Sequence, residues 1–308
     1  MGGETDSTDR LDVWRDLIRE NFVALDISAD RHGAFTGAVR SEALGHLKVA
    51  SVECTAAEYR RTPGLARRDS ATYLQVGMVN RGEAVLRQDG REAVIRPGDF
   101  AVYETERPFL WGVRGEFQLF VFTWPRASVA LWPGESQRLT ARTLEGGSGL
   151  GGIVGRMLRD LVTSPPSLTA AGSVRLADEV AELVATVAME HAGAEPPGSA
   201  VDEELHRIGA YIAEHLADPA LDPATIARAH FISTRHLHRL FAQHGSSVSR
   251  HIRQLRLERC RRELGGRNST ASIADISRRW GFADPATFSR AFRAEYRTTP
   301  SAYRRRSS

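Results

Sequence analysis

The sequence predicts an α+β protein of more than one domain, with a β-rich N-terminal domain and an all-α C-terminal domain. Three observations predict this division. The chain has 308 residues, which is longer than a single hydrophobic core usually supports. Short alternating segments occupy residues 47–122, whereas helical periodicity governs the last hundred residues. Residues 202–308 carry 19 arginines and 11 acidic residues, a net charge of +8, although the whole chain carries only +3.

Composition is that of an ordinary globular protein, with 42% hydrophobic and 26% charged residues. There is no apolar run of 18 residues, so no transmembrane helix is expected. The first ten residues are polar and acidic, and they lack the apolar stretch of a secretory signal. Cys54 and Cys260 are too few for a disulfide framework or a metal site. We therefore expect a cytoplasmic protein without a membrane partner.

The β-rich region begins after an opening helix. Helical spacing of Leu11, Trp14, Leu17 and Ile18 predicts this helix over residues 9–21. Short strands are then expected at residues 47–53, 73–79, 83–88, 92–95, 100–103 and 117–122. Turn residues separate them at 80–82, 88–90 and 96–99. Strands of this length and spacing are typical of a small barrel or sandwich.

Two helices are predicted next, over residues 150–162 and 173–191. The run EGGSGLGG at residues 145–152 indicates a flexible segment, and AGAEPPGSA at 192–200 indicates a linker. The second helix has a narrow apolar seam that includes Val180 and Val184. This seam either packs on its own domain or contacts a second subunit.

An internal repeat marks the last hundred residues. Five residues recur after 51 positions: Phe231, Ser233, Leu237, Arg239 and Phe241 return as Phe282, Asp284, Phe288, Arg290 and Phe292. Upstream, Ile226 and Arg228 return after 50 positions as Ile276 and Arg278. One residue is therefore gained in the second turn, and we assign the gain to Gly281.

Each copy predicts a helix, a short turn and a second helix. Ser233 and Asp284 are expected to cap the second helices, and Pro285 suits a first helical position. A helix-turn-helix places its second helix in the major groove of DNA. At about 100° per residue, the second helices bury Leu237, Leu240, Phe241, Phe288, Ala291 and Phe292.

The opposite faces of these helices carry the candidate base contacts. In the first copy they are Arg235, His238 and Arg239, and in the second copy Ala286, Thr287 and Arg290. Arginine binds guanine O6 and N7 in bidentate fashion, and short methyl groups can meet a thymine methyl. Because Arg239 and Arg290 hold the same place in both copies, base reading is favoured for them. Arg235 and His238 are equally compatible with phosphate or water contacts.

A helix predicted over residues 247–264 lies between the copies and carries six arginines. A basic end on an acidic body indicates a polyanion partner. Candidates for phosphate contacts are Arg250, Arg253, Arg293 and Arg297. One rigid helix would hold the two recognition helices on one side of double-stranded DNA, about 34 Å apart.

Residues 202–306 resemble the DNA-binding domain of AraC/XylS-type bacterial transcriptional regulators. The resemblance rests on IARAHFISTRHLHRLFAQHG in the first unit and on SIADISRRWGFADPATFSRAFRAEYRTTPSAYRR at the end. Arg297 stands where the family usually has glycine, so a different local turn is expected there. By position, the resemblance assigns base contacts to Arg235, His238 and Arg239, and to Ala286, Thr287 and Arg290.

The resemblance also implies a cupin-like sensing domain, carried by WRDLIRENFVALD at residues 14–26 and RPGDFAVYETERP at 96–108. The fold class then becomes a cupin-like β-barrel with flanking helices before a domain of two helix-turn-helix units. We expect a sensing domain over 1–145, a helical dimerisation or coupling segment over 146–191, a linker over 192–201 and the DNA-binding domain over 202–308. The implied function is a transcriptional activator that binds a small effector, forms a homodimer and contacts RNA polymerase.

Four residues are candidates for lining an effector pocket, with core packing as the alternative for each: Tyr73, Gln75, Tyr103 and Trp111. The identity of the effector cannot be derived from these residues. A regulator controlled by protein contacts instead of a ligand also remains open.

A cupin enzyme fused to a DNA-binding domain is the remaining alternative. Metal cupins need two or three histidines and a carboxylate on adjacent strands. Residues 1–200 contain only His32, His46 and His191, none of them within residues 73–122. Glu104 and Glu106 are interpreted as surface carboxylates, and no nucleophile, phosphate or dinucleotide motif occurs. We therefore expect no catalysis, no metal and no cofactor.

Overall fold

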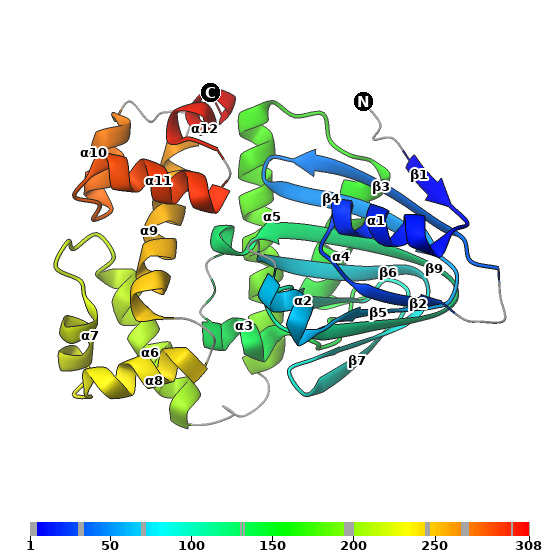
Figure 1. Ribbon diagram of the computed structural model, residues 1–308, viewed down its shortest axis with the longest axis horizontal. Helices are drawn as coiled ribbons and strands as arrows, with labels where there is room; N and C mark the ends of the chain where they lie inside the picture. The colour runs from blue at the N-terminus through cyan, green and yellow to red at the C-terminus, as the bar shows by residue number, and fades with distance from the viewer. Residues whose placement is uncertain are drawn as a thin grey trace. The chain divides into compact units, whose positions relative to one another are not determined.

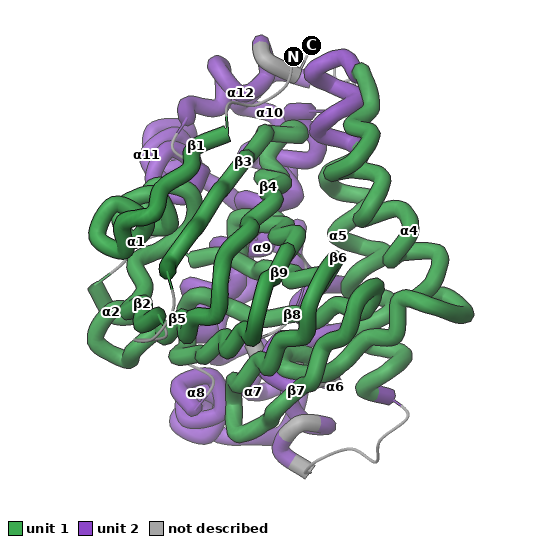
Figure 2. Tube along the Cα trace, turned by 90° about the vertical axis from the view of Figure 1, so that its right-hand side faces the viewer, with its two compact units in different colours: residues 1–129, 139–167, 176–192 green, residues 130–138, 168–175, 193–308 purple. Residues whose placement is uncertain are grey.

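The protein is described by a computed structural model that covers residues 5–29, 34–68, 72–129, 131, 133–193, 200–243, 247–265, 271–296 and 298–307. The chain forms two compact units (Figure 2). The N-terminal unit contains residues 1–129, 139–167 and 176–192, and the C-terminal unit contains 130–138, 168–175 and 193–308.

One antiparallel sheet of nine strands, counted over the described residues, builds the N-terminal unit (Figure 1). The strands are β1 (Thr5–Thr8), β2 (Asp26–Ala29), β3 (Gly37–Leu44), β4 (Leu47–Cys54), β5 (Ala57–Arg61), β6 (Tyr73–Gln88), β7 (Arg91–Ile95), β8 (Phe100–Glu104) and β9 (Phe109–Pro125). Short helices α2 (Pro63–Arg68) and η1 (Arg126–Ser128) follow β5 and β9, and α3 (Pro133–Leu139) comes next. Every predicted strand lies within an observed one, but the segments 73–79 and 83–88 form one continuous strand, β6. The strands β1, β2, β3 and β5 and the first half of β9 were not predicted.

The sheet curls into a half-barrel because its two long strands bend. β6 pairs with β8 through its first half and with β7 through its second half, while β9 pairs with β6, β4 and β5. The bend in β6 is a bulge at Arg81 and Gly82, where Gly82 has φ +83°. The turn predicted at 80–82 is therefore wrong, since the strand bends there without ending. The turns at 88–90 and 96–99 are confirmed.

Helix α1 (Leu11–Asn21) closes the concave side of the sheet, which confirms the opening helix. Its Trp14 and Ile18 are buried in the same cluster as Tyr59 and Trp111. Trp14 Nε1 donates to the Tyr59 hydroxyl at 3.0 Å. A Cβ atom at Gly37 would lie 2.7 Å from the Trp14 ring, so glycine is required there.

Helices α4 (Gly149–Thr163) and α5 (Ala170–Gly193) pack on the convex side of the sheet. Trp124 Nε1 donates to the Ala177 carbonyl at 2.9 Å, and His46 Nε2 lies 3.3 Å from Asp178 Oδ1. The apolar seam of α5, with Val180 and Val184, is buried within its own chain. Packing on the same chain therefore accounts for the seam.

The glycine-rich run at residues 145–152, which leads into α4 and forms its first turn, serves close packing rather than flexibility. A Cβ atom at Gly146 would lie 1.8 Å from the Gly98 carbonyl oxygen, and one at Gly151 would lie 2.2 Å from the Glu145 carbonyl oxygen. The Gly146 N–H donates to Asp99 Oδ1 at 3.1 Å. Only glycine lets the backbone approach this closely, so the interpretation of residues 145–152 as a flexible segment is wrong.

The C-terminal unit is all-α in the described residues. Besides most of α3 and the start of α5, it contains the helices α6 (Ala200–Glu214), α7 (Pro223–Ala229), α8 (Thr234–Gln243), α9 (Val248–Leu264), α10 (Ile273–Arg279), α11 (Pro285–Tyr296) and α12 (Pro300–Ser307). Two hydrophobic clusters share helix α9. Val248 and Ile252 belong to the cluster of α6, α7 and α8, whereas Leu257, Cys260 and Leu264 belong to that of α10, α11 and α12. The expected helix between the copies thus joins two separate small cores. Residues 194–199, which contain most of the expected linker, lie outside the described residues.

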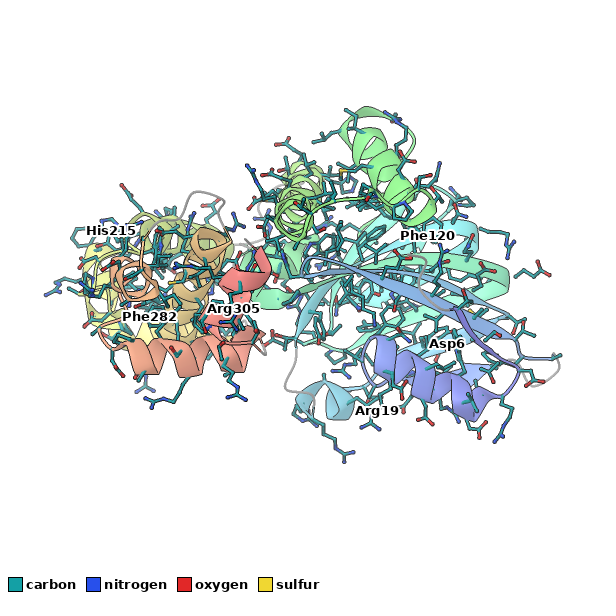
Figure 3. The ribbon with its side chains drawn as sticks, turned by 90° about the horizontal axis from the view of Figure 1, so that it is seen from above. Asp6, Arg19, Phe120, His215, Phe282 and Arg305 are labelled. Carbon is teal, nitrogen blue, oxygen red and sulfur yellow. The ribbon has the colours of Figure 1, made fainter. Side chains whose placement is uncertain are left out.

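The turn of the first unit differs from the predicted repeat register. Phe231 has φ +55° and its side chain is 98% exposed, while Gly281 has φ +77° at the equivalent place. Ile232 N–H donates to the Ala227 carbonyl, just as Phe282 N–H donates to the Ser277 carbonyl. Phe282 is buried among the helices of its unit (Figure 3), so it matches Ile232 and not Phe231. The residue gained in the second turn is therefore Ala283, and its assignment to Gly281 is wrong.

Phe231→Gly is expected to raise the free energy of unfolding of the C-terminal unit by about 0.5–1 kcal/mol. The left-handed conformation is unfavourable for phenylalanine, and the exposed ring gains no burial in return. Gly281→Ala is the matched opposite case, with an expected loss of about 1–2 kcal/mol. Calorimetry of the full chain measures both, and a destabilised Phe231→Gly variant would contradict this account.

Candidate nucleic-acid interface

The first helix-turn-helix unit consists of α7, its turn and α8, and local sequence signals fix both helix starts. Asp222 Oδ1 accepts the Thr225 N–H at 2.7 Å, which lowers the pKa of Asp222, and Pro223 occupies the first position of α7. Ser233 Oγ accepts the His236 N–H at 3.1 Å at the start of α8. The predicted cap at Ser233 is confirmed.

The second unit consists of α10, its turn and α11. Asp284 accepts the backbone N–H groups of Ala286 and Thr287 at 3.0 and 2.9 Å, and Pro285 is the first residue of α11. The Thr287 hydroxyl donates to Asp284 Oδ2 at 2.6 Å, which together with the backbone bonds lowers the pKa of Asp284. The predicted cap at Asp284 and the predicted place of Pro285 are confirmed.

The burial of both second helices follows the predicted sorting except at Ala291, which is only partly buried. Leu237, Leu240 and Phe241 are buried in α8, and Phe288 and Phe292 in α11. The candidate base contacts are all exposed: Arg235, His238, Arg239, Ala286, Thr287 and Arg290. Each unit therefore presents one helix with a buried apolar face and an exposed face that carries arginine.

The arginines Arg239 and Arg290 are held by side chains three residues earlier. Arg239 Nη2 lies 2.7 Å from His236 Nδ1, and Arg290 Nη2 donates to Thr287 Oγ1 at 3.1 Å. His236 was not singled out from the sequence. The spacing of three residues, which places side chains on one helix face, is the signal that could have identified it.

Helix α9 divides its six arginines between structural and exposed positions. Arg256 donates to the carbonyls of Leu216 and Asp218 at 3.1 and 2.6 Å, so it ties α9 to the segment after α6. Arg259 lies over the Trp280 ring, 5.8 Å from its centroid. Arg261 and Arg262 bind Glu258. Arg256, Arg261 and Arg262 are therefore engaged within the unit, whereas Arg259 is exposed beside the Trp280 ring.

The remaining arginines of this helix, Arg250 and Arg253, are exposed and form no ion pair with any described residue. Arg293 on α11 is exposed as well. Arg297, the fourth phosphate candidate and the place of the unusual turn, lies outside the described residues. The phosphate candidates that can be located are thus available on the surface of the unit.

Carboxylates in this part of the chain are used internally. Glu258 is 3% exposed and binds Arg261, and Glu263 binds Arg279 and the Trp280 indole N–H. Asp275 accepts the Ser272 hydroxyl, which lowers the pKa of Asp275, and Asp284 caps α11. Glu263 and Asp275 thus pair with the exposed Arg279 and Arg278, and Glu258 and Asp284 are used within the unit. Because none of these carboxylates pairs with the exposed Arg250 or Arg253, a polyanion ligand is favoured.

Three of the four predicted effector residues face the interior of the half-barrel. Tyr103 and Trp111 belong to its core cluster, with ring centroids 5.4 Å apart, and burial raises the pKa of Tyr103. Gln75 pairs with Tyr103 in register and donates to Thr123 Oγ1 at 2.8 Å. Tyr73 is only half-buried.

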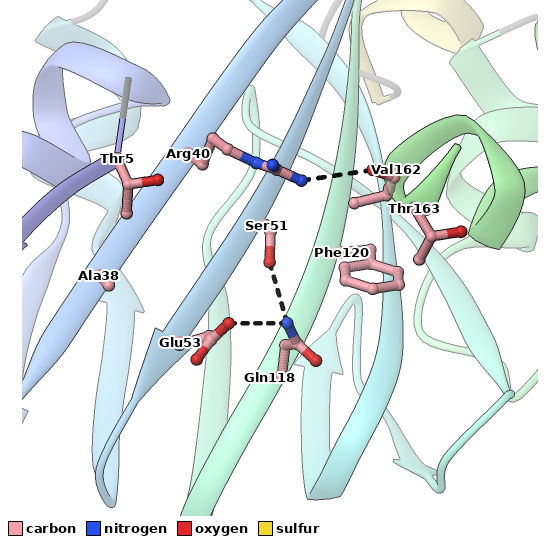
Figure 4. A pocket seen from close by; sticks show the side chains of 9 residues that line it. All are labelled: Thr5, Ala38, Arg40, Ser51, Glu53, Gln118, Phe120, Val162 and Thr163. Carbon is pink, nitrogen blue, oxygen red and sulfur yellow. Dashed lines mark hydrogen bonds between the residues drawn. The ribbon is translucent and has the colours of Figure 1, made fainter. Parts of the chain in front are cut away.

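A cleft of about 290 Å³ lies on the other face of the sheet, beside the end of α4 (Figure 4). Arg40 Nη2 donates to the Val162 carbonyl at 3.4 Å at its rim, and Gln118 Nε2 donates to Ser51 Oγ and Glu53 Oε1 at 3.2 and 2.8 Å. None of the predicted effector residues lines this cleft.

The expectation that Glu104 is a surface carboxylate is wrong, because its side chain is buried. It is 1% exposed, and Arg107 and Arg126 form ion pairs with it, while Glu106 is exposed.

Among the described residues, no group of three or more histidines, cysteines or carboxylates is placed to hold a metal ion. No described helix is both long enough and apolar enough to cross a bilayer.

Comparison with known proteins agrees with this architecture. A model of the AraC-binding-like domain matches residues 14–187, and a model of a helix-turn-helix domain matches residues 226–306. The fold and the site thus define a two-domain transcriptional regulator. The chain belongs to the AraC family. It is a transcriptional activator with a ligand-binding-like domain and a helix-turn-helix DNA-binding domain.

Individual relatives support the same assignment. The transcriptional activator NphR of a Rhodococcus species is 32% identical over 267 residues, which are 85% of this chain and 78% of NphR. The activator RhaS of Salmonella schwarzengrund is 36% identical over 100 residues, 32% of this chain and 35% of RhaS. The crystal structure of the AraC-like activator CuxR matches with a TM-score of 0.53 at 20% identity, over 90% of this chain and all of CuxR, and shows the shared fold.

Proposed function

We propose that α8 and α11 enter successive major grooves of double-stranded DNA and read bases there. Arg235, His238 and Arg239 would contact bases in the first groove, and Ala286, Thr287 and Arg290 in the second. The observation that carries this proposal is the pair of exposed helix faces, each with an arginine at the same place, on two cores joined by α9. Ala286 offers only a methyl group, so a thymine methyl is its natural partner.

Arg250, Arg253, Arg293 and Arg297 are proposed to bind phosphates, which fix the position of the protein on DNA without reading sequence. Arg250→Ala and Arg253→Ala are expected to weaken binding to all DNA sequences alike. Each should lower the slope of log affinity against log salt by about one. Arg19→Ala is the matched control, because Arg19 is an exposed arginine of α1 in the N-terminal unit. Loss of affinity for one sequence only would contradict a phosphate role.

The N-terminal domain is proposed to bind a small effector inside the half-barrel, near Gln75, Tyr103 and Trp111. Support comes from the match to the AraC-binding-like domain and from the shared inner face of these residues. A thermal-shift screen of small metabolites on the full chain tests this. If no metabolite changes unfolding or DNA binding, control by protein contacts becomes the better explanation. In that case no small effector would change the affinity of the protein for DNA, so the coupling free energy between effector binding and DNA binding would be zero.

A homodimer is proposed through α4 and α5. Leu150, Ile153, Leu183 and Met189 on these helices are each more than a third exposed, although large apolar side chains favour burial. Sedimentation should give a dimer that Ile153→Glu dissociates, and a monomer at high concentration would contradict the proposal.

RNA polymerase is the proposed partner in activation. We propose that the protein acts in the cytoplasm as a regulator without catalytic activity.

A further inference from the structure

Both recognition helices hold their arginine through a chain of two side chains. In the first unit, Glu204 Oε2 on α6 lies 3.1 Å from His236 Nε2, and His236 Nδ1 lies 2.7 Å from Arg239 Nη2. The second unit repeats the arrangement, with Asp284, Thr287 and Arg290 joined at 2.6 and 3.1 Å. A carboxylate, an intermediate side chain and an arginine therefore occur in the same order in both units.

The chemistry of arginine determines the protonation state of His236. A guanidinium has donors only, so the facing Nδ1 must be an unprotonated acceptor. The proton of the neutral ring is then on Nε2, where it is donated to Glu204, and this carboxylate selects the tautomer. A doubly protonated ring has an N–H at Nδ1, so it cannot accept from Arg239 and repels its charge.

The second unit has no such dependence on protons. The Thr287 hydroxyl donates to Asp284 and accepts from Arg290, and it does not ionise at physiological pH. The hydrogen bond from Thr287 holds the pKa of Asp284 below its ordinary value, so this carboxylate stays charged where histidines titrate. The two arrangements therefore differ in the middle side chain, which is histidine in the first unit and threonine in the second. They also differ in the origin of the carboxylate, which comes from α6 in the first unit and from the cap of α11 in the second.

We propose that His236 and Thr287 are positioning residues that aim Arg239 and Arg290 at their bases, and that acidification releases Arg239 alone. This inference rests on the base-reading function proposed above. A guanidinium already held in its bound orientation loses less conformational freedom on binding, so its base contact is stronger. Because only the neutral ring has an acceptor at Nδ1, protonation of the ring removes the hold on Arg239.

Other charged and titratable groups lie near His236, and their effects differ from its own. Glu204 faces it from α6 and Arg239 faces it along α8. Glu204 and Arg207 also act on His230 at the end of α7, whose pKa is lowered by burial and by Arg207. His238, a second histidine of α8, is exposed on the proposed DNA side.

The experiment measures base discrimination of the full chain at pH 8 and pH 5.5. Discrimination is the ratio of affinities for DNA with the preferred base and with a substituted base at one position. This ratio cancels the uniform gain in phosphate attraction that any protonated histidine gives. At the position read by Arg239, discrimination should fall roughly two- to tenfold at pH 5.5, the size expected for one net hydrogen bond. At the position read by Arg290 it should stay unchanged.

Three variants test whether His236 causes the pH dependence of base discrimination. His236→Asn puts an amide oxygen near the place of Nδ1, so discrimination should match the parent at pH 8 and stay constant with pH. His236→Ala removes the acceptor, so discrimination should be low at both pH values. His238→Asn should keep the pH dependence. A flat profile in the parent, or a pH dependence that persists in His236→Asn, would overturn the proposal.

Arg239→Ala distinguishes failure of this inference from failure of the proposed function. If Arg239→Ala leaves discrimination unchanged at every position at pH 8, base reading by Arg239 is wrong and the positioning role falls with it. If Arg239→Ala removes discrimination and His236→Ala does not, only the positioning role is wrong.

Discussion

Replacing Arg239 or Arg290 by alanine is expected to relax base preference at two separate positions, about one helical turn of DNA apart. Each bidentate contact with guanine contributes about 1–3 kcal/mol of discrimination, or roughly 5- to 150-fold. Both arginines are exposed, and buried Leu237 and Phe288 fix the rotation of their helices in the same way. Each variant should therefore affect one position and leave the other intact.

Selection of binding sites from random DNA by the parent and by each variant measures this effect. The double variant should lose preference at both positions, and the two losses should add, because each arginine sits on a helix with its own core. A uniform loss of affinity over all sequences would reduce Arg239 and Arg290 to phosphate contacts.

Glu258→Met is expected to lower the free energy of unfolding of the C-terminal unit by about 3–5 kcal/mol. Arg261 is fully buried, and it donates to both carboxylate oxygens of Glu258 at 2.7 Å and to the Tyr303 hydroxyl at 2.8 Å. Tyr296 also donates to Glu258 at 3.1 Å, so the network joins α9 to α11 and α12. Removing the carboxylate leaves a buried guanidinium without a counter-ion.

The double variant Glu258→Met with Arg261→Met should recover most of this loss, because it removes both buried charges together. Arg278→Ala is the surface control. Its ion pair with Asp275 is more than half exposed, so the expected loss is below about 1 kcal/mol. Calorimetry of the full chain measures all three variants. If Glu258→Met unfolds no more easily than Arg278→Ala, the network does not stabilise the unit.

Features set by local chemistry were predictable from sequence. The caps at Ser233 and Asp284 and the buried faces with Leu237 and Phe288 depend on neighbours within one helical turn, so spacing alone identifies them. Resemblance to the AraC family assigned the domain before the structure was known. The predicted register of the turn is wrong because both copies contain a phenylalanine. The φ angle and exposure of Phe231, and the backbone hydrogen bond of Ile232, show that Phe231 matches Gly281.

Features that depend on distant partners were missed. Glu258 and Arg261 look like a solvated charge run, and only the packing of α11 and α12 against α9 buries them. His236 gains its partner Glu204 from α6, 32 positions earlier. In the N-terminal unit, Asn80-Arg81-Gly82 resembles a turn, but pairing with β9 on both sides makes it a bulge. Such pairings are set by tertiary structure and leave no local signal.

The central claim is that two recognition helices, held by one helix, read two successive grooves. The most direct test inserts five base pairs between the two recognised elements and measures the affinity of the full chain. This insertion turns the second element by about half a helical turn, to the opposite face of DNA. The account predicts that affinity falls to that of DNA with a single element, and that a ten-base-pair insertion does not restore it because α9 cannot lengthen. Unchanged affinity after the five-base-pair insertion would contradict the account.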